Sequence, residues 1–298
     1  MNLKILYANV QCLRNKINLI DAQLVASGVS VLCLSEHWLD APEVELVRIG
    51  DLKPADYFAR IQHIHGGVVQ LINSNIPYKN LPYLKKISIE IHCEMTGIFI
   101  AHLNLILVLI YRAPTGDMQI FLDKTTALMN IIDYRQKRVI IGGDFNLLFN
   151  LEYDVKATSF CELLLSYGFR PFVDFPTRNN NRLDNVFANN LCTNIEVSRL
   201  DLNLSDHVSI LVDLSIICDE TDKVTKLKLC RPLTAYGKLM FFEFISTINW
   251  DFIDGDIDVD NKFSMFLNNM LYMYYIAFPE KKIAYNLKSN SPQNGWFT

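Results

Sequence analysis

Residues 138–146 read RVIIGGDFN, and this stretch decides how the rest of the chain is interpreted. A short apolar run that ends on two glycines is typical of a buried strand that stops at the edge of a core. Because side chains alternate along an extended chain, Asp144 and Asn146 would share one face while Phe145 points to the other. Gly, Asp and Asn are also common turn residues, so this stretch taken alone is equally consistent with an ordinary strand end.

Polar side chains also stand at the ends of other strand-like runs. These runs cover residues 3–8, 29–34, 105–110, 182–187 and 208–214, and the polar residues beside or within them are Asn9, Glu36, Tyr111, Asp184, Asp206 and His207. One such residue is ordinary, because Asp and Asn form turns and a lone His is more often structural than catalytic. A whole set from widely separated segments predicts a shared polar site.

The chemistry of this set favours a hard cation and acid–base catalysis. Carboxylate and amide oxygens are the ligands that Mg²⁺ prefers. Asp184 and His207 can supply the carboxylate–imidazole pair that proton transfer requires. The sequence has no Cys-x-x-Cys pair and no His-rich motif, which argues against zinc.

Strand-like runs outnumber helical ones, and several follow one another directly. We therefore predict an α+β fold, a layered sandwich in place of a purely parallel sheet. Amphipathic helices are expected at residues 118–134 and 158–167. Residues 87–92 and 97–102 are expected to form a hairpin pair, and residues 39–60 to be mostly irregular.

Composition indicates a globular protein but does not decide its substrate. The chain has 298 residues, of which 50% are hydrophobic, enough for one sizeable core. Its net charge of −4 argues against nucleic-acid binding by bulk charge, although a local basic groove stays open. Seven cysteines without Cys-x-x-Cys spacing are expected to be reduced thiols. No signal peptide or membrane span is recognisable, so we expect an intracellular protein without membrane association.

The character of the chain changes beyond residue 217. Residues 1–217 are expected to form the first domain, and the charged, patternless residues 218–238 a linker. Residues 239–298 are rich in Phe, Tyr, Met and Leu and are expected to be largely helical.

The order of the polar motifs resembles a known family. Asn9 is followed by LSEHWL (34–39), YRAP (111–114), GGDFN (142–146), RLDNVF (182–187) and SDH (205–207). This order resembles the endonuclease/exonuclease/phosphatase family, and more closely the apurinic-type endonuclease domain of non-LTR retrotransposons. The joint occurrence of GDFN and SDH is more specific than any single short motif.

The resemblance implies a fold and a domain plan. The expected fold is a two-sheet β-sandwich flanked by helices in four layers, with the site at one edge. The C-terminal segment resembles the helical connector of such elements, truncated before any reverse transcriptase. Gln11 and Cys12 depart from the family pattern, so the first loop is expected to have a different shape.

The resemblance also implies an activity, which is phosphodiester hydrolysis that depends on Mg²⁺, or on Mn²⁺ in its place. Glu36 would bind the metal, with Asn9 and Asp206 near its coordination shell. Nicked DNA with a 3′-hydroxyl would be the product, and the enzyme would be nuclear if it cuts chromosomal DNA. No organic cofactor is implied, and the oligomeric state stays open.

The remaining site residues take their roles from the same resemblance. Asp144 would orient or deprotonate the attacking water, and Asn146 would hold that carboxylate. His207, oriented by Asp184, would donate to a phosphate oxygen, and Tyr111 would add a further donor. Contacts to DNA are expected from Thr177, Arg14, Arg112, Arg178 and Arg182.

Two alternatives remain open at this point. One is a phosphatase or phosphodiesterase that acts on a lipid or inositol phosphate, because that chemistry shares the core residues. The other is a non-catalytic remnant of a retrotransposon. The TR pair at 177–178 followed by RLDNVF favours DNA, and the complete set of polar residues argues against decay of the site.

Overall fold

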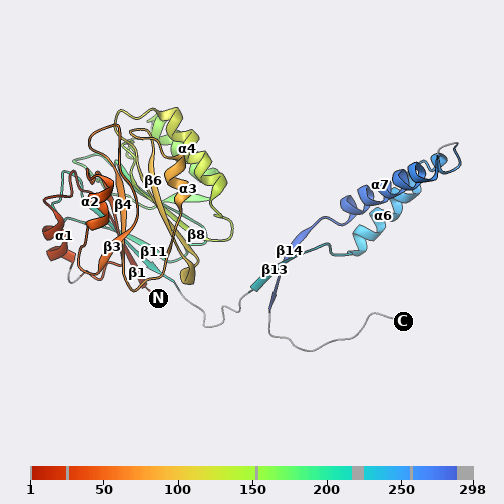
Figure 1. Ribbon diagram of the computed structural model, residues 1–298, viewed down its shortest axis with the longest axis horizontal. Helices are drawn as coiled ribbons and strands as arrows, with labels where there is room; N and C mark the ends of the chain where they lie inside the picture. Colours follow the sequence, from red (N-terminus) through yellow and green to blue (C-terminus); the bar gives the residue numbers. More distant parts are fainter. Residues whose placement is uncertain (1, 25–26, 152–153, 217–224, 256–257, 287–298) are drawn as a thin grey trace. The chain divides into compact units, whose positions relative to one another are not determined.

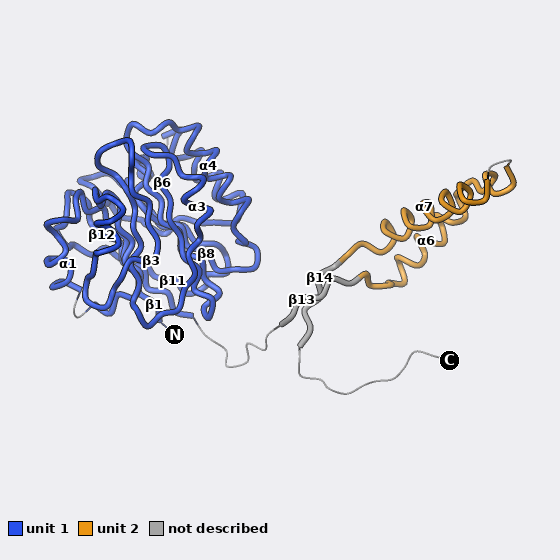
Figure 2. Tube along the Cα trace, viewed as in Figure 1, with its two compact units in different colours: residues 1–217 blue, residues 218–298 orange. Residues whose placement is uncertain are grey.

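The structure is a computed structural model, and it describes residues 2–24, 27–151, 154–216, 225–255 and 258–286. The chain divides into two compact units, residues 1–217 and 218–298 (Figures 1 and 2). The first unit contains two six-stranded mixed sheets and the helices that cover them. Each unit is described by itself below.

The first sheet carries the N-terminal strand at its centre. Its strands in spatial order are β11 (Ile195–Leu200), β12 (Ser209–Ser215), β1 (Asn2–Asn9), β2 (Val31–Ser35), β4 (Val68–Asn73) and β3 (Leu52–Phe58). Only β1 and β2 are parallel neighbours, and all other pairs are antiparallel. Parallel pairing brings the C-terminal ends of β1 and β2 to the same edge of the sheet.

The second sheet repeats this plan around another parallel pair. Its strands in spatial order are β5 (Lys79–Asn80), β6 (Glu94–Ile100), β7 (Leu105–Tyr111), β8 (Arg138–Asp144), β10 (Asp184–Asn189) and β9 (Phe169–Pro171). Here β7 and β8 are parallel, and β10 runs antiparallel to β8. The C-terminal ends of β7 and β8 therefore meet the N-terminal end of β10.

Helices cover the outer faces of both sheets and complete four layers. The helices of the first unit are α1 (Ile17–Leu24), α2 (Ala41–Leu46), α3 (Pro82–Ile87), α4 (Met118–Ile131) and α5 (Val155–Ser166), and a 3₁₀ turn covers Ala101–Leu103. Buried residues of α1 and α2 join one outer apolar cluster, and those of α3, α4 and α5 join the other. The predicted α+β two-sheet sandwich flanked by helices is confirmed.

The apolar runs of the sequence are explained by strands that are buried on both faces. In β7, Leu107 and Leu109 lie in the cluster between the sheets, while Ile106 and Val108 pack in the cluster under α4. Alternate side chains therefore enter different cores. This explains why the run from 105 to 111 is apolar throughout instead of alternating.

The two glycines of RVIIGGDFN allow close packing around β8. A Cβ atom on Gly142 would lie 2.5 Å from the ring of Tyr7, which belongs to the other sheet. Gly143 has a φ of +147°, and a Cβ atom there would lie 1.9 Å from the carbonyl oxygen of Ile110. Neither position accepts a side chain without movement of its neighbour.

Two local predictions in the first unit were wrong. Residues 87–92 do not pair with 97–102, because Ile87 ends helix α3, the residues after it form a turn closed by the Ile89–Cys93 bridge, and β6 pairs with β7 instead. Residues 39–60 are not mostly irregular, because they contain α2 and β3. Asp40 and Glu43 form a capping box at the start of α2, a signal that was present in the sequence.

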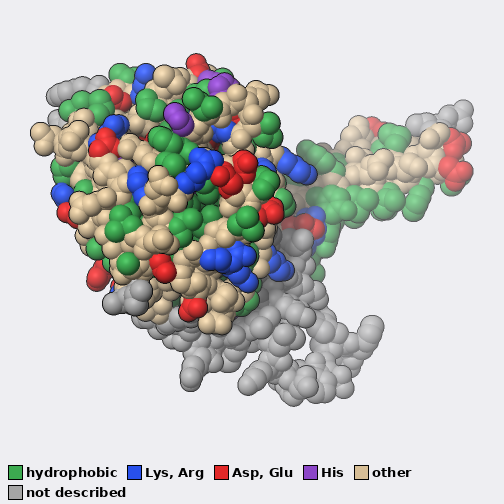
Figure 3. Space-filling view, turned by 60° about the vertical axis from the view of Figure 1, so that its left-hand side comes forward, with side chains coloured by type: hydrophobic (Ala, Val, Ile, Leu, Met, Phe, Trp, Pro, Cys, Tyr) green, Lys and Arg blue, Asp and Glu red, His purple; other side chains and the backbone are tan. Residues whose placement is uncertain are grey.

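The second unit contains two long helices and a short ribbon. They are α6 (Ala235–Thr247), α7 (Val259–Ala277) and the antiparallel strands β13 (Thr225–Cys230) and β14 (Lys281–Asn286), with a 3₁₀ turn at Asp251–Ile253. The expected linker 218–238 thus includes a strand and the first turn of α6, and its residues 218–224 lie outside the described part. Figure 3 shows hydrophobic side chains, in green, on the surface of this unit.

Two further predictions concern cysteines and membranes. Cys12, Cys33, Cys93, Cys161 and Cys192 are free thiols, as predicted, while Cys218 and Cys230 fall outside the described side chains. Among the described residues, no helix combines the length and apolarity that crossing a bilayer requires.

Candidate active site

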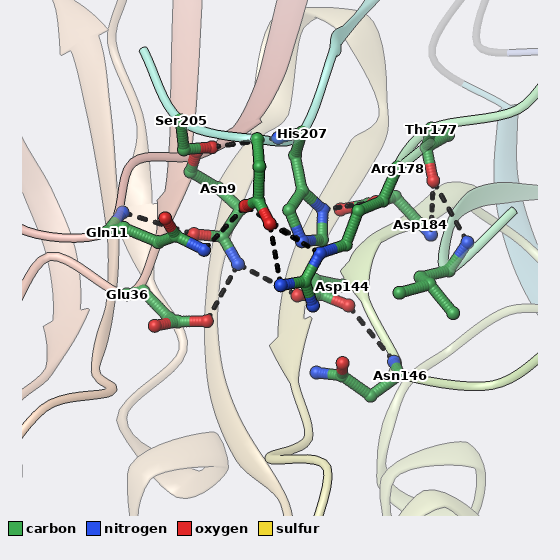
Figure 4. A network of polar contacts seen from close by, with 12 residues as sticks. Asn9, Gln11, Glu36, Asp144, Asn146, Thr177, Arg178, Asp184, Ser205 and His207 are labelled. Carbon is green, nitrogen blue, oxygen red and sulfur yellow. Dashed lines mark hydrogen bonds and ion pairs between the residues drawn. The ribbon is translucent and has the colours of Figure 1, made fainter. Parts of the chain in front are cut away.

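The polar strand ends predicted from the sequence meet at one edge of the sandwich (Figure 4). Asn9 at the end of β1 pairs in register with the last residue of β2, and Glu36 follows directly. In the other sheet, Asp144 at the end of β8 is in register with Tyr111 of β7 and with Asp184 of β10. Two parallel pairs, one from each sheet, therefore deliver their C-terminal ends to the same place.

Asn9 joins the two sheets through its side chain. Its Nδ2 donates to Glu36 Oε1 and to Asp144 Oδ2, both at 2.8 Å. Its Oδ1 accepts from the backbone N–H of Gln11 at 3.1 Å, and its carbonyl oxygen accepts from the Ser205 hydroxyl at 2.6 Å. An amide held on both its oxygen and its nitrogen fixes the two carboxylates relative to each other.

Asp144 is fully buried and is held on both oxygens. Oδ2 accepts from Asn9, and Oδ1 accepts from the backbone N–H of Asn146 at 3.0 Å. Burial, assisted by the charge of Asp184, raises the pKa of Asp144 to about 8. This carboxylate can therefore exchange a proton near neutral pH.

Asn146 supports Asp144 through its backbone and supports the neighbouring loop through its side chain. Its Nδ2 donates to the carbonyl oxygen of Arg112 at 2.8 Å. The prediction that Asn146 lies beside Asp144 matches this geometry, but the group that contacts the carboxylate is the backbone N–H. Phe145 between them is fully buried in the outer core.

His207 and Asp184 form a buried pair on the other side of Asp144. His207 Nδ1 donates to Asp184 Oδ2 at 2.8 Å. Burial alone would lower the pKa of His207, but the hydrogen bond and charge of Asp184, together with Asp144, raise it to about 9. The imidazole therefore carries both protons at neutral pH, with Nε2–H left as a second donor.

Thr177 and Ser205 position this pair from behind. Thr177 Oγ1 accepts from the backbone N–H groups of Leu183 and Asp184, at 2.9 and 3.1 Å. Ser205 Oγ accepts from the backbone N–H of His207 at 3.1 Å while it donates to Asn9. Ser205 was not among the predicted site residues, although it directly precedes Asp206 and His207 in the sequence.

Tyr111 lies in the same wall of the site and is almost fully buried. Burial, and then the charges of Glu36 and Asp144, raise the pKa of Tyr111 well above its ordinary value. The phenol therefore stays protonated and is able to donate a hydrogen bond.

Asp206 is placed at the rim of the site. It accepts from Arg178 at 2.6 Å and from Gln11 Nε2 at 2.7 Å, and it is half exposed. Gln11 was noted only as a departure from the family pattern. The structure gives it a role in tying the first loop to Asp206 and Arg178 at the rim.

The four predicted DNA-contacting arginines occupy different environments. Arg178 lies at the rim, and Arg14 is exposed in a 2.6 Å ion pair with Glu43. Arg112 is buried, and its guanidinium donates to carbonyl oxygens at positions 116, 145 and 146. Arg182 likewise donates to carbonyl oxygens at positions 149 and 173. Arg112 and Arg182 thus brace the loop after Asp144, which is at odds with contacts to a DNA backbone.

The donor groups of the site fit a hard divalent cation. Among the described residues, Asp144, Asp184 and His207 offer ligand atoms within 4.8 Å of one another. Asp184, however, holds a protonated His207, whereas Glu36 projects from the opposite side of Asn9 with a partly exposed carboxylate. The imidazolium of His207 balances the charge of Asp184, so a divalent cation beside Glu36 would balance the remaining carboxylate.

A four-layer sandwich with buried acids, an amide and a carboxylate–imidazole pair at its edge defines the class of phosphoester hydrolases. The family model for the endonuclease/exonuclease/phosphatase family matches residues 6–207, and the chain belongs to this family. Members of this family hydrolyse phosphate esters, and they typically use a divalent metal.

Solved structures with the same fold cover the first unit. The chain is similar to the endonuclease domain of TRAS1, a telomere-specific non-LTR retrotransposon, with 16% identity and a TM-score of 0.58 over 72% of this chain and 98% of that one. It is also similar to an AP endonuclease from Archaeoglobus fulgidus, with 14% identity and a TM-score of 0.52 over 72% of this chain and 100% of that one. A third similar structure is the 3′ phosphatase NExo from Neisseria bound to a product DNA hairpin, with 14% identity and a TM-score of 0.53 over 72% of this chain and 100% of that one. At these identities the likeness shows the fold. No curated protein matches the chain.

Proposed function

We propose that this protein is a metal-dependent endonuclease of retrotransposon origin that nicks DNA and leaves a 3′-hydroxyl. The observation that carries the proposal is the bridge from Asn9 to both Glu36 and Asp144, with the His207–Asp184 pair on the opposite side of Asp144. Asp144, a general base for the attacking water, and His207, a protonated donor for the phosphate, thus lie on two sides of the position that the phosphate would occupy. Such an arrangement suits an in-line attack on a phosphodiester.

Asp144 acts on the attacking water. Its carboxylate is fixed by Asn9 and by the backbone N–H of Asn146, so it can aim one lone pair at a water without reorganisation. The pKa of about 8 gives it enough basicity to take a proton from that water as the bond to phosphorus forms.

His207 stabilises the charge that develops on the phosphate. With Nδ1–H held by Asp184, the Nε2–H is available to a non-bridging oxygen. The pKa of about 9 keeps the ring cationic over the working pH range. Tyr111, which stays protonated, can serve as a further donor to the phosphate.

Glu36, with Asn9 and Asp206 close by, would hold Mg²⁺ or Mn²⁺, which supplies charge neutralisation at the leaving 3′ oxygen. Arg178 and Arg14 are the two surface arginines of the four, and each would contact the DNA backbone by exchanging its exposed partner, Asp206 or Glu43, for a phosphate. Thr177 supports the strand that carries Asp184. DNA as the substrate is supported by the retrotransposon endonuclease and the DNA-bound phosphatase among the similar structures. Cutting chromosomal DNA would place the protein in the nucleus.

The test is nicking of supercoiled plasmid in Mg²⁺. We expect the wild type to nick and EDTA to stop the reaction. Asp144→Asn and His207→Ala should each slow nicking by at least about 100-fold, because each removes a group that acts only in the transition state. Asp123→Asn, on the exposed face of α4, is the matched control and should nick at the wild-type rate. Direct extension of the nick by a DNA polymerase would verify the 3′-hydroxyl.

Two outcomes would contradict the proposal. One is equal nicking by the wild type and Asp144→Asn, or none by either. The other is robust phosphate release from inositol phosphates, which would favour the alternative of a phosphatase or phosphodiesterase for such substrates. A folded wild-type protein with neither activity would favour the remaining alternative, a non-catalytic remnant of a retrotransposon.

A further inference from the structure

A cavity of about 390 Å³ lies directly beside the proposed metal-binding carboxylate. Trp38 forms part of its wall, and the indole Nε1 donates to Glu36 Oε2 at 3.2 Å. The ring of His65 stacks on Trp38 with the ring centroids 4.1 Å apart and the planes 27° from parallel. Trp38 follows Glu36 by two residues, so at most about 7 Å of chain separates them. A group in this cavity would be an immediate neighbour of the scissile phosphate.

The loop that carries His65 is held firmly from both ends. Glu90 accepts from the backbone N–H groups of residues 61, 62 and 63, at 2.5, 3.1 and 2.9 Å, and from the ring of His63. The buried Glu94 joins the two ends, because it accepts from the side chain of Arg60 before the loop at 2.6 Å and from the N–H of Gly67 after it at 2.7 Å. Two carboxylates thus fix a loop that contains no helix or strand.

This fixed loop exposes two large apolar side chains. Ile61 is 94% exposed and Ile64 is 81% exposed. Figure 3 shows a face of the molecule on which histidine side chains lie close to hydrophobic and to basic ones. Large apolar groups that a rigid loop presents at the mouth of a cavity are typical of an interaction site.

Each charged side chain that lines the cavity already has a partner, although Nη2 of Arg60 is buried without one among the described residues. Arg14 is bound by Glu43 and Arg60 by Glu94, and Asp40 caps helix α2. His63 has Glu90 as its partner. The cavity therefore offers ring faces and an aliphatic edge in place of a free cation, which suits a flat uncharged ring better than a phosphate.

We infer that this cavity is a nucleobase subsite, in which a base adjoining the cleaved phosphate stacks on the Trp38–His65 pair with Ile64 at its edge. The inference rests on the proposed action on DNA and adds how one nucleotide is recognised. Every nucleobase has a π-face, so the subsite should bind any of the four bases but should not bind a nucleotide that lacks its base.

The test measures binding, so it does not require cleavage. A dye-labelled 12-nucleotide single strand and an equally long strand with tetrahydrofuran in place of every nucleoside would be titrated by fluorescence anisotropy into the Asp144→Asn protein in Mg²⁺. His65→Asn removes the ring, and Asn tolerates the φ of +65° at this position. We expect His65→Asn to weaken binding of the normal strand by about 5- to 150-fold and to leave binding of the base-free strand unchanged.

Matched variants sharpen the test. His65→Tyr keeps a ring and should restore most of the affinity, and Ile64→Thr should weaken binding of the normal strand alone. Val155→Thr alters another exposed apolar residue, on α5, and should change neither titration. Equal effects of His65→Asn on both strands, no effect on either, or no binding of either strand would overturn the subsite.

The nicking assay separates this inference from the proposed function. If the wild type nicks plasmid and His65→Asn binds the oligonucleotide with unchanged affinity, the proposed endonuclease activity is supported and the subsite is contradicted. Base-dependent loss of binding without nicking by the wild type would support the subsite and contradict the endonuclease.

Discussion

At the scale of the residue, the site depends on backbone conformations that few side chains favour. Gln11, Glu36, Trp38 and Asn146 all have φ between +39° and +57°, although none is glycine. Such conformations cost on the order of 1–3 kcal/mol each, and they persist only where the surroundings determine them. Here they turn each strand end sharply, so that Glu36 and Asp144 point at the same amide.

His37, next to Glu36, gives the residue-scale prediction. The side chain is fully buried, Nδ1 accepts from the N–H of Leu39 at 3.0 Å, and Nε2 contacts the carbonyl oxygen of Phe58 at 3.1 Å. Burial lowers the pKa of His37 to about 4, although the carbonyl of Phe58 opposes this shift. The neutral ring is therefore required in the folded state.

The lowered pKa of His37 makes the folded state less stable in acid. The pKa of a histidine in the unfolded chain is about 6.5, so the stabilisation is fully present above that pH and is lost as the pH falls toward 4. Between pH 7 and pH 5 we expect the wild type to lose about 2 kcal/mol more unfolding free energy than His37→Gln. Urea unfolding of both proteins in EDTA measures this difference. The same pH dependence in both would contradict the assigned pKa.

The sequence predicted the identity of the site residues better than their contacts. Asn9, Asp144 and His207 stand at strand ends, and strand ends can be recognised from apolar runs. The contacts of Arg112 and Arg182 with loop carbonyl oxygens were not predictable in this way. A guanidinium has five donors that serve a phosphate and a loop carbonyl equally well, so the choice depends on the tertiary fold.

At the scale of the element, β8 is the strand whose sequence is most restricted by its neighbours. A Cβ atom on Gly142 meets a side chain, the ring of Tyr7, whereas one on Gly143 meets the backbone of Ile110. A side chain can be removed by mutation and a backbone cannot. The two glycines should therefore respond differently to the same change.

We expect Gly142→Ala to cost about 2–3 kcal/mol of unfolding free energy in the wild type and at most about 1 kcal/mol in a Tyr7→Ala background. Gly143→Ala should cost at least as much, with no relief from Tyr7→Ala, because its φ and the Ile110 carbonyl are unchanged. Urea unfolding of the single and double variants gives the coupling energies. Equal coupling of both glycines to Tyr7 would refute the packing described for β8.

Elements were predicted well where one rule decided them and poorly where two rules competed. The runs that became β7 and β8 are long and apolar, and no helical signal opposes them. Residues 87–92 look extended, but Pro82 at the first turn commits the preceding segment to α3. Helix α2 has only six residues, too few to show periodicity, so its capping box was the one signal that could have predicted it.

At the scale of the whole molecule, all three apolar clusters of the sandwich belong to the first unit. Their buried members lie between Leu3 and Ile216, and the similar solved structures are covered almost completely by 72% of this chain. The overall architecture was predictable because two sheets with both faces buried need helices outside them. The ribbon of β13 and β14 was not predicted, although Leu227 and Leu229 alternate with lysines in β13, because the charged residues around this short stretch are equally typical of a linker.

These observations predict that residues 1–216 form an independent enzyme. A chain that ends at Ile216 keeps every member of the three clusters and every residue of the proposed site. We expect it to unfold cooperatively in urea and to nick plasmid within about twofold of the full chain, because it keeps all three apolar clusters of the sandwich.

The remainder, residues 217–298, should behave differently when produced alone. Of its described helices, α6 exposes Phe242 and α7 exposes Phe263 and Tyr272, each by more than 60%. Met273, Ala277 and Phe278 are buried, but they make too small a core for two helices with so much exposed apolar surface. This piece should therefore self-associate in analytical ultracentrifugation, while residues 1–216 stay monodisperse. Loss of cooperative unfolding in the 1–216 chain would instead mean that the sandwich needs the second unit to fold.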